Sequence, residues 1–162
     1  MRQRPRPEDD ADRKLMSMID EHGWAVRIVG DPDGKLPTFH YSAGMYERTG
    51  QPELLVIGLN HEVGHWVVNE YGRRCTLGEK FQAGQIYDEF LEGHRVTFVE
   101  VDWRAASNAY TSWTAWYYSP DGFPLLQLVW PDPKTSVFPW EPGFRDEIRD
   151  AQPVLGQLGG SA

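Results

Sequence analysis

One short segment of the chain carries residues of the right type and spacing for metal chemistry. His61-Glu62-Val63-Gly64-His65 places two imidazoles four residues apart, and a helix would bring them to one face. Two such imidazoles can bind zinc, and the glutamate between them can polarise a zinc-bound water. The motif therefore indicates one concrete activity, a zinc-dependent hydrolase with His61 and His65 as metal ligands and Glu62 as general base.

The helix that must hold this motif argues against that activity. Asn60 is a typical N-cap, so the motif occupies the first turn of a helix over residues 61–71, and Gly64 loosens that turn. The histidines lie opposite the expected core face, which consists of Val63, Trp66, Val67 and Tyr71. A zinc site would need a further ligand, for which the candidates are Glu79, Glu89, Glu92 and His94. We therefore interpret the two histidines as part of a solvated polar face and expect no metal cofactor.

The rest of the sequence predicts the elements around this helix. Hydrophobic patterning predicts strands over residues 24–29, 38–43, 54–59, 95–101 and 125–130. Helical spacing predicts two more helices, over 11–21 and 83–92, which end at Gly23 and Gly93. The aromatic segment 110–118 fits either a strand or a short helix. Because strands outnumber helices, we expect the α+β class, with a largely antiparallel sheet of about five strands and two or three helices.

The length of 162 residues fits one domain with one hydrophobic core. Residues 1–11 are charged and contain proline, so we expect a disordered lead-in. We expect the single α+β domain to span residues 12–150. Residues 151–162 end in Gly-Gly-Ser-Ala and are predicted to form a flexible tail.

Composition excludes several classes of function. The formal net charge of −8 repels phosphate backbones, so we expect no nucleic-acid partner. No apolar run is long enough to span a membrane, and we expect no membrane partner. Cys75 is the single cysteine, which rules out an intramolecular disulfide and a cysteine-based zinc site. These features are typical of a cytoplasmic protein.

Several short segments, taken in order, resemble a known family. They are Glu21-His22-Gly23-Trp24, Phe39-His40-Tyr41-Ser42-Ala43-Gly44-Met45, Gln51-Pro52-Glu53-Leu54-Leu55-Val56-Ile57-Gly58-Leu59, Gly78-Glu79, Phe81, Tyr87, Gln127-Leu128-Val129-Trp130-Pro131-Asp132 and Phe138-Pro139-Trp140. The ordered set resembles the bacterial domain of unknown function 4262 family over about residues 20–144. The resemblance implies no established reaction. It implies that His65 and Asn69 are family-like, whereas the position of His61 usually holds a proline or a small residue.

The candidate binding residues are polar side chains next to apolar strands and helices, namely His22, Tyr41, His65, Asn69, Gln127 and Asp132. Burial of such groups requires hydrogen-bond partners, so they either satisfy one another or converge on a pocket. Helix capping is the alternative for His22, core packing for Tyr41 and an Asx turn for Asp132.

The high aromatic fraction of 13% fits a firm core or a ligand pocket. We expect a domain that binds an unknown small molecule or protein partner in a cleft between the sheet and the helix 61–71. This cleft would be lined by aromatic and polar residues. The sequence leaves open whether the protein is also an enzyme, and the zinc-dependent hydrolase is the alternative.

Overall fold

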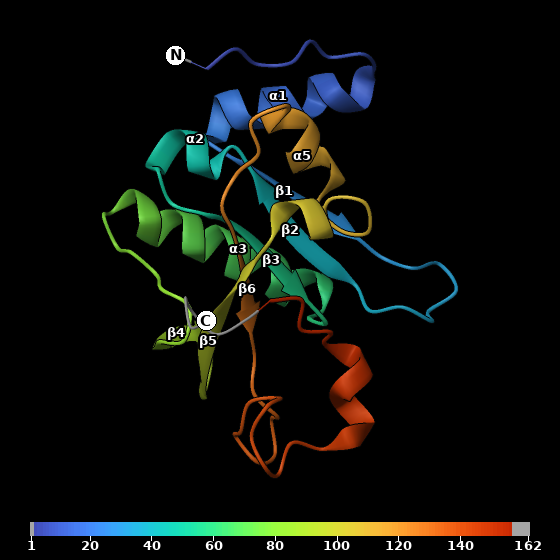
Figure 1. The fold of residues 1–162 in the computed structure, drawn as a ribbon, viewed down its shortest axis with the longest axis vertical. Helices are drawn as coiled ribbons and strands as arrows, with labels where there is room; N and C mark the ends of the chain where they lie inside the picture. The colour runs from blue at the N-terminus through green and yellow to red at the C-terminus, as the bar shows by residue number, and fades with distance from the viewer. Residues whose placement is uncertain (1, 157–162) are drawn as a thin grey trace.

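A six-stranded mixed sheet forms the centre of the computed structural model, which describes residues 2–156 (Figure 1). The strand order is β1-β2-β3-β6-β5-β4. The strands are β1 (Ala25–Val29), β2 (Phe39–Ala43), β3 (Glu53–Ile57), β4 (Ile86–Leu91), β5 (His94–Val101) and β6 (Leu125–Val129). Neighbouring strands are antiparallel except for the central pair β3 and β6, which is parallel.

Helices cover both faces of this sheet. They are α1 (Asp10–His22), α2 (Met45–Thr49), α3 (His61–Thr76), α4 (Trp103–Ala106), α5 (Ser112–Tyr118) and the 3-10 helix η1 (Asp146–Ala151). Helices α1, α4 and α5 contribute to the hydrophobic cluster on one face, and α3 contributes to the cluster on the other face. In the part of the chain that the structure describes, no helix is long and apolar enough to cross a membrane.

The central strands are apolar on both faces because each face is covered. In β3, Leu54 and Val56 point to the α3 side, whereas Leu55 and Ile57 point to the side of α1 and α5. Side chains of β6 alternate in the same way, so both strands are near-continuous apolar runs. This double burial holds the carboxyl ends of the parallel pair in fixed positions.

The structure confirms the α+β class and the five predicted strand positions. Helix α1 ends at Gly23, whose φ of 96° is unfavourable for other residues, as predicted. Helix α3 begins after Asn60, whose side-chain oxygen accepts a hydrogen bond from the Val63 amide at 2.9 Å. The segment 110–118 contains helix α5. The predicted numbers of strands and helices are wrong, because the sheet has six strands and α2, α4 and η1 were not predicted.

The helix predicted over residues 83–92 is also wrong, because this segment contains β4. Between Tyr87 and Leu91 a bulge places three residues of β4 opposite one residue of β5, and Glu89 adopts a left-handed φ of 71°. The bulge turns Tyr87 and Phe90 to the same face, where both rings pack against Phe81 and Phe98. Two aromatic residues three positions apart therefore imitate helical periodicity.

The predicted core face of α3 is wrong at Trp66, which is 52% exposed. Gly64 instead faces the sheet, where it packs against the buried ring of His40 on β2. A Cβ atom added to Gly64 would lie 2.2 Å from atoms of this ring. The glycine therefore sets how closely the first turns of α3 approach β2.

This contact predicts an unusual effect of alanine at position 64. Alanine normally stabilises a helix interior by about 1 kcal/mol relative to glycine. Here we expect Gly64→Ala to destabilise the fold by about 1–3 kcal/mol, because the added methyl overlaps His40. Urea unfolding measures the change. The additional substitution His40→Ala should recover part of the loss, and a Gly64→Ala protein more stable than the parent would contradict this packing.

Candidate functional site

The structure scatters most of the predicted binding residues. His22 lies exposed at the end of α1, and its Nε2 is 3.7 Å from the Glu21 carboxylate. Tyr41 is buried on β2, and its hydroxyl accepts a hydrogen bond from the Trp113 amide at the start of α5. These two side chains do not meet in one site.

His65 and Asn69 are the predicted pair that the structure brings together. The Asn69 amide nitrogen lies 3.3 Å from His65 Nδ1, one helical turn away. The Asn69 oxygen accepts a hydrogen bond of 2.9 Å from the indole of Trp24. This contact ties α3 to the segment that enters β1, so Asn69 has a structural role.

Gln127 fastens the C-terminal segment to the sheet. It lies buried on β6, where its amide donates to the carbonyl of Pro153 at 2.7 Å and its oxygen accepts from the Leu155 amide at 2.9 Å. The side chain of Gln152 binds the backbone just after β6. Its oxygen accepts a hydrogen bond from the Trp130 amide at 2.8 Å, and its amide group donates to the Trp130 carbonyl at 2.9 Å. Residues 152–155 therefore lie against β6. Residues 157–162 of the predicted flexible tail lie outside the described residues.

Asp132 organises the loop after β6. Its buried carboxylate accepts hydrogen bonds from the Arg145 guanidinium, with the closest contact at 2.8 Å, and from the Lys134 amide at 2.8 Å. The second contact is the Asx turn that the sequence offered as an alternative. The Arg145 guanidinium holds the pKa of the Asp132 carboxyl well below its usual value.

The His-Glu-x-x-His segment occupies the first turn of α3. His61, Glu62 and His65 are all exposed. Among residues 2–156, no group of three or more histidine, cysteine, aspartate or glutamate side chains is arranged to hold a metal ion. The hydrolase alternative requires such a third ligand beside His61 and His65.

A histidine that was not predicted as a site residue lies beneath this turn. His40 is fully buried, and its Nε2 is 3.2 Å from the carbonyl oxygen of His61. Burial lowers the pKa of His40, with a smaller contribution from the nearby imidazoles of His61 and His65. The alternation of β2 was the available signal, because it places His40 on the face opposite Tyr41.

A groove between α3 and β4 is the most suitable place for a ligand. It has a volume of about 530 Å³, within the range of small-molecule sites. We call it the α3–β4 groove, and it is lined by Glu62, Val63, Trp66, Glu89, Phe90, Leu91 and Glu92. Four of these residues are apolar and the other three are glutamates.

The groove continues to the carboxyl ends of the two parallel strands. A second hollow of about 480 Å³ shares Val63, Leu91 and Glu92 with it and reaches Gly58 after β3 and Trp130 after β6. The carboxyl ends of parallel strands are a common place for ligands in α/β sheets. The bulge in β4 borders the same groove, because Glu89 adopts its left-handed conformation there. Such strain in a residue other than glycine is frequent at functional sites.

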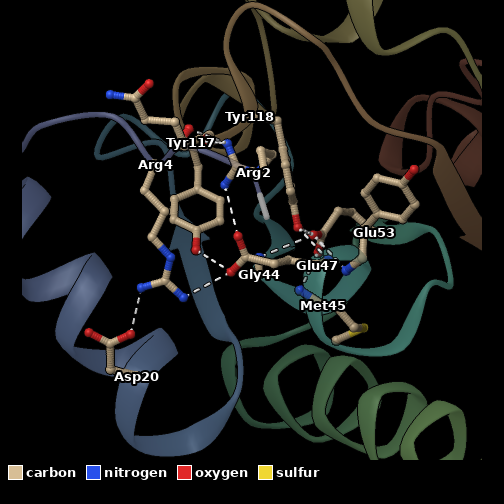
Figure 2. A network of polar contacts seen from close by, with 11 residues as sticks. Arg2, Arg4, Asp20, Gly44, Met45, Glu47, Glu53, Tyr117 and Tyr118 are labelled. Atoms are coloured by element: carbon tan, nitrogen blue, oxygen red, sulfur yellow. Dashed lines mark hydrogen bonds and ion pairs between the residues drawn. The ribbon is translucent and has the colours of Figure 1, made fainter.

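A buried carboxylate on the other face of the sheet was also missed by the sequence analysis. Glu53 on β3 is fully buried and accepts five hydrogen bonds. Ser42 Oγ donates at 2.6 Å and the Tyr46 amide at 3.0 Å. The amides of Gly44 and Met45 and the hydroxyl of Tyr118, labelled in Figure 2, donate at 3.1, 3.2 and 2.5 Å. Burial raises the pKa of Glu53, and these hydrogen bonds oppose the rise. A glutamate at the edge of an apolar strand was the available sequence signal.

The ion pair of Asp132 predicts a pH-dependent loss of stability. Because its pKa is lowered in the folded state, ionised Asp132 stabilises the fold above its ordinary pKa of about 4. This contribution is lost as the pH falls through the folded-state pKa. We therefore expect Asp132→Asn to be less stable than the parent at pH 7, with a difference that shrinks below about pH 4. Urea unfolding across this pH range measures it.

The matched control is Asp146→Asn, which removes an exposed carboxylate that pairs with Arg149 at 3.3 Å. We expect this control to change stability little at any pH. If Asp132→Asn and Asp146→Asn have the same effect at pH 7, Asp132 does not have the structural role described above.

Comparison with known proteins identifies the family of the chain. The family described as a domain of unknown function (DUF4262) matches residues 18–145, which include all six strands and most of the helices. No curated protein matches the chain. No solved structure matches it. The match covers most of the sequence and confirms the resemblance found in the ordered segments, so the chain belongs to the DUF4262 family.

Proposed function

We propose that this domain binds a small organic cation with an apolar body in the α3–β4 groove. The observation that carries this proposal is the lining of the groove, which combines the half-exposed indole of Trp66 with three glutamates and no lysine or arginine. An indole face and nearby carboxylates both attract a cation. Phe90 and Leu91 offer apolar contacts for the remainder of the ligand.

The size of the groove favours a small molecule over a protein partner. A stable protein interface buries about 800 Å² on each partner, whereas a pocket of a few hundred cubic ångströms suits a compact ligand. The residues that line the groove include no serine, cysteine or lysine that could act as a nucleophile. We propose that the groove binds its ligand without covalent catalysis by a hydroxyl, thiol or amine.

We also propose that this function operates in the cytoplasm. Cys75 is a free, buried cysteine, and burial raises the pKa of its thiol to about 11. A chain with one unreactive thiol and no disulfide suits a reducing compartment.

Three probes of matched size test the proposed binding. They are 4-phenylbutylamine, 4-phenylbutanol and 4-phenylbutyrate, which carry a positive, zero and negative charge at pH 7. Isothermal titration calorimetry should show saturable one-to-one binding of the amine, about tenfold weaker binding of the alcohol and no binding of the carboxylate. Equal binding of the amine and the carboxylate would show that the glutamates do not select the ligand.

Two sets of variants locate the binding. Trp66→Ala and the double variant Glu89→Gln/Glu92→Gln should each weaken binding of the amine by about tenfold, because they remove the indole face or two charges. The matched control is Trp140→Ala, since Trp140 is 41% exposed and does not line the groove. Binding that responds to Trp140→Ala as strongly as to Trp66→Ala would place the ligand elsewhere.

A further inference from the structure

A second site lies on the opposite side of the sheet, where the N-terminal segment meets α2 and α5. Figure 1 shows α1, α2 and α5 together at one end of the molecule, with β4 toward the other end. Between these helices, Glu47 of α2 and the adjacent Tyr117 and Tyr118 of α5 surround the side chain of Arg2 (Figure 2). We call Glu47, Tyr117 and Tyr118 the guanidinium site.

The contacts of Arg2 are those expected for a guanidinium ligand. Its Nη2 pairs with the Glu47 carboxylate at 3.1 Å, and its Nη1 donates to the carbonyl of Tyr117 at 2.7 Å. The Cζ atom lies 4.7 Å from the centroids of both the Tyr117 and the Tyr118 rings. A planar cation between two aromatic rings and a carboxylate combines cation–π, ion-pair and hydrogen-bond recognition.

The site is held in place by groups other than the arginine. The Tyr117 hydroxyl donates to Glu47 Oε1 at 2.6 Å. The Tyr118 hydroxyl accepts a hydrogen bond from the Glu47 amide at 3.1 Å and donates its own proton to buried Glu53. Partial burial opposes ionisation of Glu47, but hydrogen bonds from Tyr117, Arg4 and Arg2 lower its pKa below the usual value. The Tyr117 hydroxyl therefore orients this carboxylate independently of the two arginines.

The N-terminal segment that places Arg2 in the guanidinium site is held to the domain by few hydrogen bonds. Residues 2–9 have no regular secondary structure. Within the described part of the chain, residues 2–7 hydrogen-bond to the rest of the domain only through the side chains of Arg2 and Arg4. Arg4 bridges Glu47 at 2.9 Å and Asp20 at 2.6 Å. Two side chains on an irregular segment can leave without disturbing the sheet.

Room for a larger ligand remains beside the two arginines. A cavity of about 750 Å³ is lined by Arg2, Arg4, Tyr46, Glu47, Gly50 and Tyr118. Among the described residues, the buried Nε of Arg2 has no hydrogen-bond partner, so the contact of Arg2 with its own chain leaves one donor unsatisfied. A ligand with a better placed arginine could occupy the same rings and carboxylate and also fill this cavity.

We propose that the guanidinium site binds an arginine-containing peptide, and that Arg2 is a ligand from the same chain that occupies the site until the peptide displaces it. The N-terminal segment then acts as an intramolecular competitor. Its tether gives it an effective concentration in the millimolar range, so an external peptide binds the parent protein more weakly than the vacant site.

A full-length variant with a vacant site tests this proposal. Arg2→Gln/Arg4→Gln removes both guanidinium groups, and its control, Arg6→Gln/Arg13→Gln, removes the same charge from exposed positions. The probe is a fluorescein-labelled peptide with the sequence of residues 2–8, Arg-Gln-Arg-Pro-Arg-Pro-Glu. Fluorescence anisotropy should show at least about tenfold tighter binding to Arg2→Gln/Arg4→Gln than to the parent or the control.

Two further measurements separate the site from general attraction to an acidic protein. A peptide with lysine at each arginine position should bind the vacant variant at least about fivefold more weakly, because lysine cannot form the planar contacts. Adding Glu47→Gln to the vacant variant should abolish peptide binding while circular dichroism remains unchanged, and Glu21→Gln is its control. The proposal is wrong if the vacant variant binds no better than the parent, or if the lysine and arginine peptides bind equally.

Discussion

The buried carboxylate of Glu53 is the contact on which much of this fold depends. It lies on a central strand with no exposure to solvent, and five donors from β2, from α2 with its N-cap Gly44, and from α5 surround it. An unpaired charge in this position would cost several kcal/mol, so the donors are constrained to remain close to it. Three of them are consecutive amides, and they fix a helix of five residues that is too short to be stable alone.

Two surfaces of the domain are positioned by contacts of this kind. On one face, Glu53 holds α2 and Tyr118, which together place Glu47 beside the rings that contact Arg2. On the other face, the close approach of Gly64 to His40 seats α3 against β2 and leaves Trp66 exposed toward the groove. The two surfaces lie on opposite sides of one sheet, so each proposed ligand can bind without the other.

The sequence predicts the parts of the fold that depend on local patterns. Five strands, the capped start of α3 and the glycine end of α1 follow from hydrophobic spacing and from the residues at the ends of helices. The pattern fails at β4 because the bulge at Glu89 shifts the phase of the strand. It also fails for the sites, since Glu53 and Tyr118 are 65 residues apart and only the tertiary fold brings them together. Asp132 and Gln127, which the sequence predicts as binding residues, form hydrogen bonds that only the tertiary fold reveals, and these hydrogen bonds fasten loops.

Hydrogen exchange at the amides of Gly44, Met45 and Tyr46 tests the role of Glu53 most directly. In the parent protein these amides donate to the carboxylate, and we expect exchange as slow as that of the β3 amides. In Glu53→Gln the side-chain NH2 group opposes these donors, so their exchange should accelerate at least about tenfold relative to β3. In the control Glu100→Gln, which changes an exposed residue of β5, it should not. Unchanged protection of the three amides in Glu53→Gln would contradict this account.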